Sequence, residues 1–376
     1  MTKLKRHRDL LSGEKLTAAV TDVHQSVQVV EDKVNTLSRH LQHLYLVDDE
    51  EISLRHREDL VRKRQFVLSK LDPPDYLYDL EKASNERHDP TSGDWLLADT
   101  TFGIWADVTT MEPRDLYLNG IPGSGRFQYL KSHIIFYPIS LLTRTCLGKT
   151  IATARVVQHL QQLRASGGNT NVGGFVLLYF FFKHHQHDKR TFVAMLLSFL
   201  SQTLFQDEVL LDLIHKRCTL ADQQKIRSES LLRELAKLVL QAQRRCFIVV
   251  DALDECDGDQ LGKPEDAQGI VIDWLESLRE HQNGSKPSDR CIRLLISGQR
   301  NGVLDQRLKH WPAIRLDSSS SHMNDIKMYC EAKRLQIRQE FDALEDIENI
   351  SLDIIRRVTS RAKGRRRTDP TFLLTS

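Results

Sequence analysis

The sequence predicts an α/β fold in which helices cover a parallel sheet, preceded by an α-helical region. From residue 116 onward, short apolar runs alternate with helical segments. The predicted strands are Leu116–Leu118, Phe175–Phe182, Cys246–Val250, Cys291–Ile296 and Ala313–Leu316. The predicted helices between them are Ile151–Leu163, Thr191–Leu204 and Leu231–Gln241. Strands that are apolar on both faces and alternate with helices indicate a parallel sheet buried between helices.

Length and composition fit a globular chain of two or three domains. The 376 residues are 40% hydrophobic and 28% charged, and Lys+Arg 53 against Asp+Glu 51 gives a net charge of +2. So small a net charge favours neither nucleic acid nor a membrane surface as a partner. There is no apolar run long enough to span a bilayer and no CxxC pair among the six cysteines. The basic first residues lack an apolar h-region, so we expect no signal peptide. We therefore expect a cytoplasmic protein.

A heptad pattern marks the N-terminal region, residues 1–84. Apolar residues recur there at alternating steps of four and three over residues 16–44. They are Leu16, Val20, Val23, Val27, Val30, Val34, Leu37, Leu41 and Leu44. The pattern fits either a helix packed against its own chain or a coiled coil between copies, and a second helical stretch, Ile52–Leu71, could cover the seam. Pro73–Pro74 ends that stretch, because the residue before a proline avoids the helical conformation.

The remaining boundaries follow from changes in composition. Residues 85–115 combine a polar linker with an aromatic beginning of the next domain, and residues 116–317 form its core. A helical segment, residues 318–364, follows, in which Ser318–Ser321 can cap a helix that begins near Asn324 and a second helix covers Ile347–Val358. Residues 365–376 form a tail.

Two halves of a phosphate-binding motif lie apart in the chain. GIPGSG, residues 120–125, follows the first predicted strand, whereas the lysine and hydroxyl residue of GxxxxGK[ST] appear only at Lys149-Thr150. In this motif glycines let backbone N–H groups surround phosphate, the lysine reaches the β- and γ-phosphates, and the hydroxyl binds Mg²⁺. Removal of residues 126–148 restores GIPGSGKT. The predicted nucleotide-binding residues are Gly120, Gly123, Ser124, Gly125, Lys149 and Thr150.

Residues 126–148 have two explanations. A genuine insertion costs only roughly 3 kcal/mol in loop-closure entropy, but it separates the glycines from the lysine and the helix N-terminus, which bind phosphate together. Alternatively, the segment is translated intron sequence. We favour the intron hypothesis, because the composition suits neither a loop nor an amphipathic element.

Acidic residues follow the strand Cys246–Val250. An apolar strand that ends in a carboxylate is how such folds hold Mg²⁺–nucleotide, so Asp251 is expected to bind the metal together with Thr150. Asp254 and Glu255 would polarise the attacking water or complete the metal shell. The alternative is a buried strand that ends in a solvated acidic turn.

Arg300 follows the strand Cys291–Ile296 and is placed to sense the γ-phosphate. An ordinary surface arginine at a strand end is the competing interpretation. Asp254, Glu255 and Arg300 are the predicted catalytic residues.

Taken together, these motifs resemble those of fungal NACHT-domain proteins, signal-transduction NTPases (STAND) of the NOD-like receptor class. The similarity is strongest to the nephrocystin-like N-terminal NTPase domain of fungal ankyrin- or WD-repeat proteins. It rests on Trp95-Leu96-Leu97, LYLNGIPGSG, KT, LLYFFF, VVDALDE and LLISGQRNGVLDQRL, in that order, over roughly residues 20–364. The resemblance implies an AAA+-like P-loop NTPase sheet and slow ATP or GTP turnover that drives oligomerisation. It assigns the phosphate loop to Gly120, Gly123, Gly125, Lys149 and Thr150.

The chain departs from that family at two places. One is the segment 126–148. The other is the C-terminus, where relatives continue after a sequence like Ala362-Lys363-Gly364 into more helices, a winged-helix module and repeats. We interpret residues 365–376 as an aberrant tail on a truncated chain.

We therefore expect a switch that binds ATP or GTP with Mg²⁺, hydrolyses it slowly and self-associates, helped by the heptad helix. The alternative is a scaffold with an inactive NTPase core, which acts on protein partners through its helical N-terminal region. Residues 126–148 distinguish the two, because their presence in the protein would abolish nucleotide affinity.

Overall fold

The chain forms two compact units, Met1–Gln65 and Phe66–Ser376. The computed structural model describes residues 2–87, 89–107, 114–120, 148–166, 174–221, 224–258, 264–279, 291–300 and 302–340, together with positions 352 and 356. The glycine-rich residues 121–125, the rest of the segment up to 147 and the tail 365–376 lie outside this description, as does nearly all of the predicted helix Ile347–Val358.

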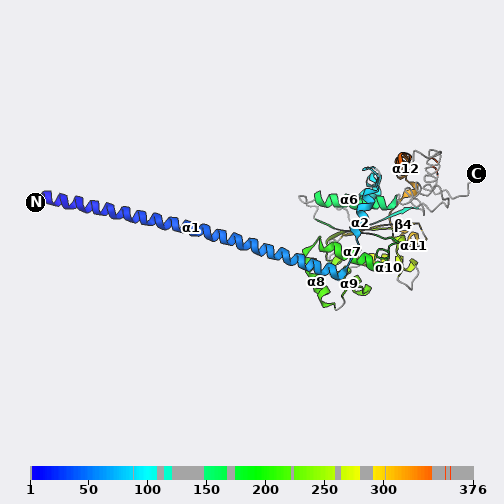
Figure 1. Ribbon diagram of the computed structural model, residues 1–376, viewed down its shortest axis with the longest axis horizontal. Helices are drawn as coiled ribbons and strands as arrows, with labels where there is room; N and C mark the ends of the chain where they lie inside the picture. The colour runs from blue at the N-terminus through cyan, green and yellow to red at the C-terminus, as the bar shows by residue number, and fades with distance from the viewer. Residues whose placement is uncertain are drawn as a thin grey trace, which may run out of the picture. The chain divides into compact units, whose positions relative to one another are not determined.

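A single helix, α1 (Thr2–Leu71), contains both helical stretches that the sequence predicts separately (Figure 1). Ile52–Leu71 therefore continues the heptad helix and does not fold back on it. Among the seam residues whose side chains are described, Val27, Val30, Val34 and Leu37 are 55%, 59%, 57% and 62% exposed. The helix ends before Pro73, as predicted, and Asp72 has a φ of 45°, a conformation that aspartate tolerates better than most residues.

Five parallel strands form the predicted sheet. They are β1 (Asp115–Gly120), β2 (Val176–Phe181), β3 (Arg245–Asp251), β4 (Cys291–Gln299) and β5 (Ala313–Arg315), in the order β2-β3-β4-β1-β5. All four pairings are parallel, and β4 separates β1 from β3. Because the strands run the same way, their carboxyl ends meet at one edge of the sheet. An all-parallel sheet flanked by helices is compatible with a P-loop NTPase-like fold.

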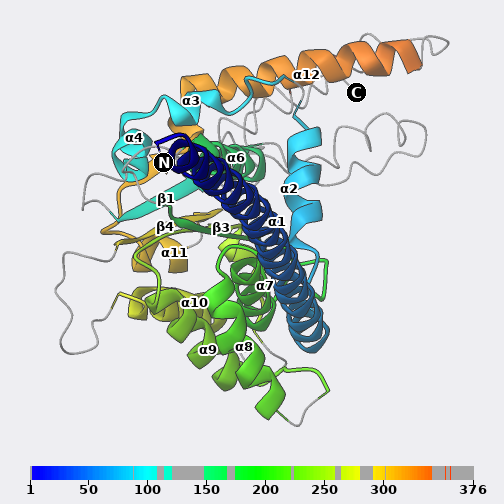
Figure 2. The same ribbon diagram turned by 90° about the vertical axis from the view of Figure 1, so that its left-hand side faces the viewer.

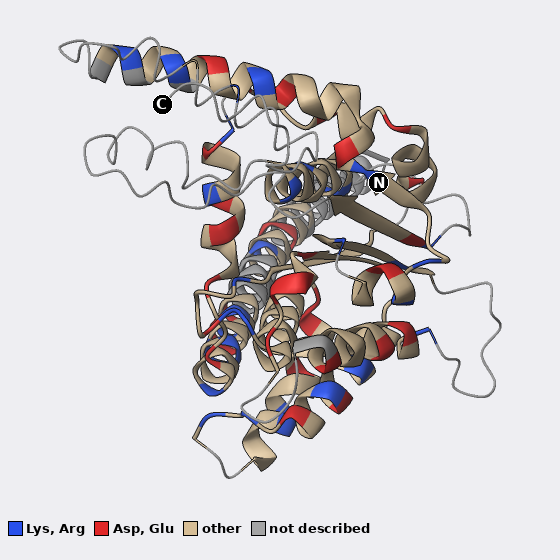
Figure 3. Ribbon diagram, turned by 90° about the vertical axis from the view of Figure 1, so that its right-hand side faces the viewer, with Lys and Arg blue, Asp and Glu red and all other residues tan. Residues whose placement is uncertain are grey.

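Helices lie on both sides of this sheet (Figure 2). One side carries α2 (Tyr76–Asn85), α3 (Asp94–Leu97), α4 (Thr100–Ala106) and α6 (Lys149–Ser166). The other side carries α7 (Phe192–Leu204), α8 (Glu208–Leu220), α9 (Glu229–Gln241), α10 (Pro264–Ser277) and α11 (Val303–Arg307). The helix predicted near Asn324 is α12 (Ser320–Glu340), which begins earlier because the Ser319 hydroxyl accepts a hydrogen bond from the His322 amide. Acidic and basic residues are interspersed along these helices (Figure 3).

Several short helices were not predicted, and two longer ones, α8 and α10, were missed although each begins with a recognisable signal. The Asp207 side chain caps α8 by accepting hydrogen bonds from the Val209 and Leu210 amides. Pro264 occupies the first position of α10, where a missing N–H costs nothing. Within the described residues, no helix is both long enough and apolar enough to cross a membrane.

A buried arginine attaches α4 to the sheet. Arg293 lies within β4 and is 1% exposed, and its guanidinium donates to the carbonyls of Ile104, Trp105 and Asp107 at the C-terminal end of α4. The last carbonyls of a helix lack partners within the helix and carry partial negative charge, so they pair well with a cation. Nearby, the Trp105 ring nitrogen donates to the Leu294 carbonyl at 3.2 Å. The aromatic part of residues 85–115 thus packs into the core.

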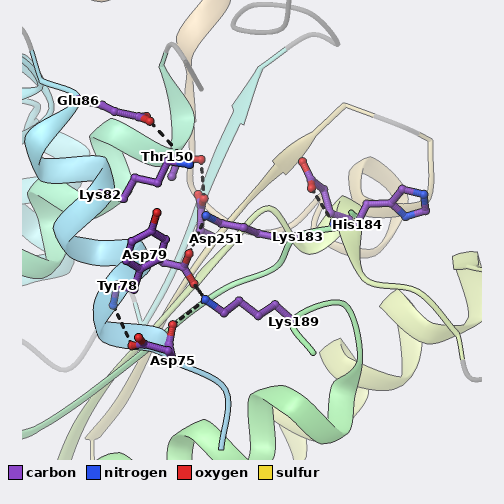
Figure 4. Close-up of polar contacts among 11 residues, drawn as sticks. Asp75, Tyr78, Asp79, Lys82, Glu86, Thr150, Lys183, His184, Lys189 and Asp251 are labelled. Atoms are coloured by element: carbon purple, nitrogen blue, oxygen red, sulfur yellow. Dashed lines mark hydrogen bonds and ion pairs between the residues drawn. The ribbon is translucent and has the colours of Figure 1, made fainter. Parts of the chain in front are cut away.

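A buried ion cluster attaches α2 to the loop that follows β2 (Figure 4). Asp79 is 2% exposed, and the ammonium groups of Lys183 and Lys189 lie 2.6 Å and 2.7 Å from its carboxylate oxygens. Lys189 also donates to the Asp75 carbonyl at 2.6 Å. Removal of one member of a buried pair leaves an uncompensated charge, which is more damaging than the pair itself is stabilising.

We predict that Asp79→Asn destabilises the protein far more than Asp72→Asn. Asp72 also has two cationic partners, Lys225 and Arg227, but its side chain is 49% exposed. The expected loss in the free energy of unfolding is about 3 kcal/mol for Asp79→Asn and below about 1 kcal/mol for Asp72→Asn. Equilibrium unfolding in urea measures both losses. Equal losses would show that burial does not determine how much each aspartate contributes to stability.

Candidate functional site

The candidate site lies where the carboxyl ends of β1, β3 and β4 meet the N-terminus of α6. Gly120 is the last residue of β1, and α6 begins at Lys149, directly after Gly148. Gly148 has a φ of 117°, which a residue with a side chain rarely adopts, so a glycine is required at this turn. Gly123, Ser124 and Gly125 lie outside the described residues, so Gly120 is the one predicted glycine of this half of the motif that the description places.

Asp251 is the centre of the site. It is the last residue of β3 and is 1% exposed. The Thr150 hydroxyl donates to one carboxylate oxygen at 2.7 Å (Figure 4), and the Thr153 hydroxyl donates to the other at 2.8 Å. The Ser297 hydroxyl, from β4, donates to the same oxygen as Thr153. The predicted pair of Thr150 and Asp251 is therefore brought together, and two further hydroxyls complete the arrangement.

Thr153 and Ser297 were missed by the sequence analysis. Thr153 follows Thr150 by three positions, so both hydroxyls lie on one face of α6. Ser297 is a polar residue near the end of an otherwise apolar strand. The spacing on the helix was a usable signal, whereas the contact of Ser297 depends on β4 pairing with β3.

Burial raises the pKa of Asp251, while the hydroxyls of Ser297, Thr150 and Thr153 and the positive charge of Lys149 oppose that rise. A buried carboxylate is stable as an anion only with compensating donors or a cation. Its oxygens and the Thr150 hydroxyl are hard ligands of the type that Mg²⁺ prefers, and that ion is commonly bound through one or two carboxylates plus phosphate and water. The donor set therefore fits Mg²⁺.

The other two acidic residues lie in a short 3₁₀ turn, Leu253–Glu255, after β3. The Asp254 carboxylate accepts a hydrogen bond from the Gln299 amide at 2.9 Å, and Glu255 accepts one from the His184 amide at 3.0 Å. Burial raises the pKa of Asp254, and the neighbouring charges of Glu255 and Asp251 add to the rise, whereas Lys149 opposes it. Both carboxylates thus belong to the same edge as Asp251 and are not fully solvated.

Gly298 has a steric role in this arrangement. A Cβ at this position would lie 2.5 Å from a methyl carbon of Leu304 and 3.4 Å from a carboxylate oxygen of Asp254. A larger residue would therefore force the buried Leu304 side chain to move and would crowd the Asp254 carboxylate.

The Arg300 backbone is at the expected place, since its amide donates to the Gly120 carbonyl at 3.1 Å. Its guanidinium, however, lies 3.6 Å from the Asp305 carboxylate on α11. The predicted sensor is thus next to the end of β1, with its charge directed to an acidic partner.

A small cavity adjoins the beginning of α6. Its volume is about 30 Å³, and it is lined by residues of α3, α6 and α12, including Trp95, Gly148, Ile151, His322 and Tyr329. His322 is 3% exposed, and its Nε2 atom has no hydrogen-bond partner among the described residues. Burial, together with the charge of Lys149, lowers the pKa of His322 to about 4. The imidazole is therefore neutral at pH 7.

A family model described as Nephrocystin 3, N-terminal, matches residues 140–299, less than half of the chain. The matched part contains Lys149, Thr150 and residues 251–255, whereas Gly120–Gly125 precede it and Arg300 follows it. The match begins inside the segment 126–148. No curated protein matches the chain. The predicted similarity to a nephrocystin-like N-terminal domain is confirmed for this stretch.

We predict that His322 makes the protein sensitive to acid. Because the folded pKa lies near 4 and the ordinary value is 6.5, the unfolded chain binds a proton between these values that the folded protein excludes. The loss of unfolding free energy caused by this proton is absent above pH 6.5 and grows as the pH falls below it. Between pH 6.5 and 4.5, His322→Gln should lose about 2 kcal/mol less of its unfolding free energy than the wild type.

Urea unfolding at several pH values measures this difference, and His310→Gln is the matched control because His310 is exposed. A control variant that follows the wild type is expected. Parallel pH profiles for wild type and His322→Gln would contradict the burial of a neutral imidazole.

Proposed function

We propose that this protein binds ATP or GTP with Mg²⁺ at the carboxyl edge of the sheet and hydrolyses it slowly, as a NACHT-type switch of the cytoplasm whose nucleotide state is coupled to self-association. The observation that carries the proposal is the hydrogen bond between the Thr150 hydroxyl and the Asp251 carboxylate. This contact joins the start of α6, which carries Lys149 and Thr150, to the acidic end of a buried strand, and so supports the predicted motif.

The start of α6 is suited to phosphate. Backbone N–H groups in the first turn of a helix lack partners within the helix, and the helix dipole adds positive potential there. Lys149 is the first residue of α6. Its positive charge acts to lower the pKa of Asp251, Asp254 and His322. A lysine so placed would bind the β- and γ-phosphates, and Gly120 would contribute the start of the loop.

Thr150 and Asp251 would hold Mg²⁺ by their oxygens. The ion would neutralise charge on the phosphate oxygens. Thr153 and Ser297 keep the Asp251 carboxylate oriented through their hydroxyl donors.

Asp254 and Glu255 would orient and polarise the water that attacks the γ-phosphate. Each is fixed by a backbone amide, Asp254 by Gln299 and Glu255 by His184. The raised pKa of Asp254 suits a group that takes up a proton. Arg300 would exchange its contact with Asp305 for the γ-phosphate, which would link nucleotide state to α11.

A second candidate function is a scaffold without nucleotide affinity that acts on protein partners through its helical N-terminal region. It is favoured by residues 126–148, which separate the glycines from Lys149 in the sequence. The glycine nest and the helix N-terminus bind phosphate as one unit.

Nucleotide affinity should depend on Lys149. Lys149→Ala, introduced into a variant that lacks residues 126–148, should lower the affinity for Mg²⁺–ATP or Mg²⁺–GTP at least about tenfold, because a hydrogen bond to a charged group contributes about 1.5–3 kcal/mol. Lys309→Ala, an exposed lysine, should have no effect. Titration of a fluorescent nucleotide measures the affinity of the shortened variant, of its Lys149→Ala and Lys309→Ala derivatives, and of the full chain. Affinity in the full chain equal to that of the shortened variant would exclude the scaffold, and equal affinity of Lys149→Ala would exclude the proposed site.

Asp251 should carry the magnesium dependence of binding. We expect Asp251→Asn to fold and to bind nucleotide equally with Mg²⁺ and with a chelator, because an amide is a poor ligand for the ion and the substitution removes a buried charge. The parent protein should bind more tightly with Mg²⁺. Asp257→Asn is the control, because the Asp257 carboxylate pairs with Arg190 and is not assigned to the metal. Unaltered magnesium dependence in Asp251→Asn would place the metal elsewhere.

A further inference from the structure

The apolar seam of α1 is uncovered wherever its side chains are described. Each side chain described between residues 27 and 39 is exposed, including the four seam residues Val27, Val30, Val34 and Leu37. Valine is a weak helix former, and helices in water depend on packing of an apolar face for most of their stability. A helix with this composition therefore requires a partner along the seam.

The heptad positions indicate what that partner is. Positions a are Val20, Val27, Val34 and Leu41, and positions d are Leu16, Val23, Val30, Leu37 and Leu44. β-Branched residues dominate the a positions, and leucine occupies three of the five d positions, a combination that favours two parallel strands. The seam is thus complementary to a second copy of itself.

Charges beside the seam agree with a parallel, in-register pair. Such a pair brings a g residue of one copy near the e residue five positions later in the other. Lys33 would lie near Ser38 of the second copy, and Glu31 near Ser26 of the second copy, so no like charges meet.

The same register defines where the pairing ends. The next a and d positions after Leu44 are Asp48 and Glu51, and an in-register dimer would bring identical carboxylates together there. Before Leu16, the corresponding positions are Gly13 and Asp9. The apolar seam is therefore confined to residues 16–44, although α1 continues to Leu71.

We propose that two copies of this chain associate through residues 16–44 as a parallel, in-register coiled coil. The pairing is independent of the nucleotide site, so it holds for both candidate functions. It specifies the surface, the partner and the orientation of a pairing that persists in either nucleotide state and is separate from the nucleotide-coupled self-association proposed above.

Two substitutions at neighbouring positions test this surface in the full chain. Val29 and Val30 are similarly exposed, at 53% and 59%, but only Val30 is in the seam. We expect a dimer for the wild type and for Val29→Asp, and at least tenfold weaker dimerisation for Val30→Asp, measured by sedimentation equilibrium. Circular dichroism of each protein monitors any change in helix content. A monomeric wild type, or equal effects of the two substitutions, would overturn the proposal.

Cross-linking tests the orientation. In a parallel, in-register pair, equivalent a positions face each other, so Val34→Cys should form a disulfide-linked dimer under mild oxidation. Val29→Cys places its thiol on the outer face and should not, and the wild type shows any contribution from the six native cysteines. If Val34→Cys sediments as a dimer but does not form the disulfide-linked dimer, the parallel, in-register orientation is overturned. Adding Lys149→Ala should alter neither result, which separates this surface from the nucleotide site.

Discussion

The buried carboxylate of Asp251 is the constraint on which the arrangement of the site depends. An anion with 1% exposure has to be compensated, and three hydroxyls from α6 and β4 surround it. Those contacts fix the first turn of α6 against the end of β3, which brings Lys149 near the acidic turn. The Ser297 hydroxyl also accepts a hydrogen bond from the Ala252 amide at 3.0 Å. One hydroxyl therefore orients the carboxylate and anchors the turn that carries Asp254 and Glu255.

A second polar cluster connects this edge to the segment before the sheet. In the loop after β2, the His184 amide donates a hydrogen bond to Glu255. Lys183 and Lys189 of the same loop form ion pairs with the buried carboxylate of Asp79 on α2. The Phe182 amide also donates to the Asp251 carbonyl at 3.0 Å. The loop is thus held from both sides, by the acidic strand end and by α2. Within the second unit, this loop therefore makes polar contacts with both α2 and Glu255.

Much of this could be predicted from the sequence, because strand burial and the acidic strand end leave strong local patterns. All five strands coincide with apolar runs, and Thr150 and Asp251 meet as expected. What was missed depends on contacts between distant segments: Arg293 looks like an interruption of a strand until α4 supplies carbonyls, and Ser297 acquires its role only through the pairing of β4 with β3. The two helical stretches of the N-terminal region are continuous because the polar residues between them are still compatible with a helix.

Amide hydrogen exchange locates the nucleotide most directly, since it reports on individual segments. It would be measured on the variant lacking residues 126–148, with and without saturating Mg²⁺–ATP or Mg²⁺–GTP. A nucleotide held by the start of α6 and by Asp251 should slow exchange at residues 149–153 and 251–255, and leave α8 and α9 unaffected. Bound nucleotide with unchanged exchange in those two segments would contradict a site built on the Asp251 carboxylate.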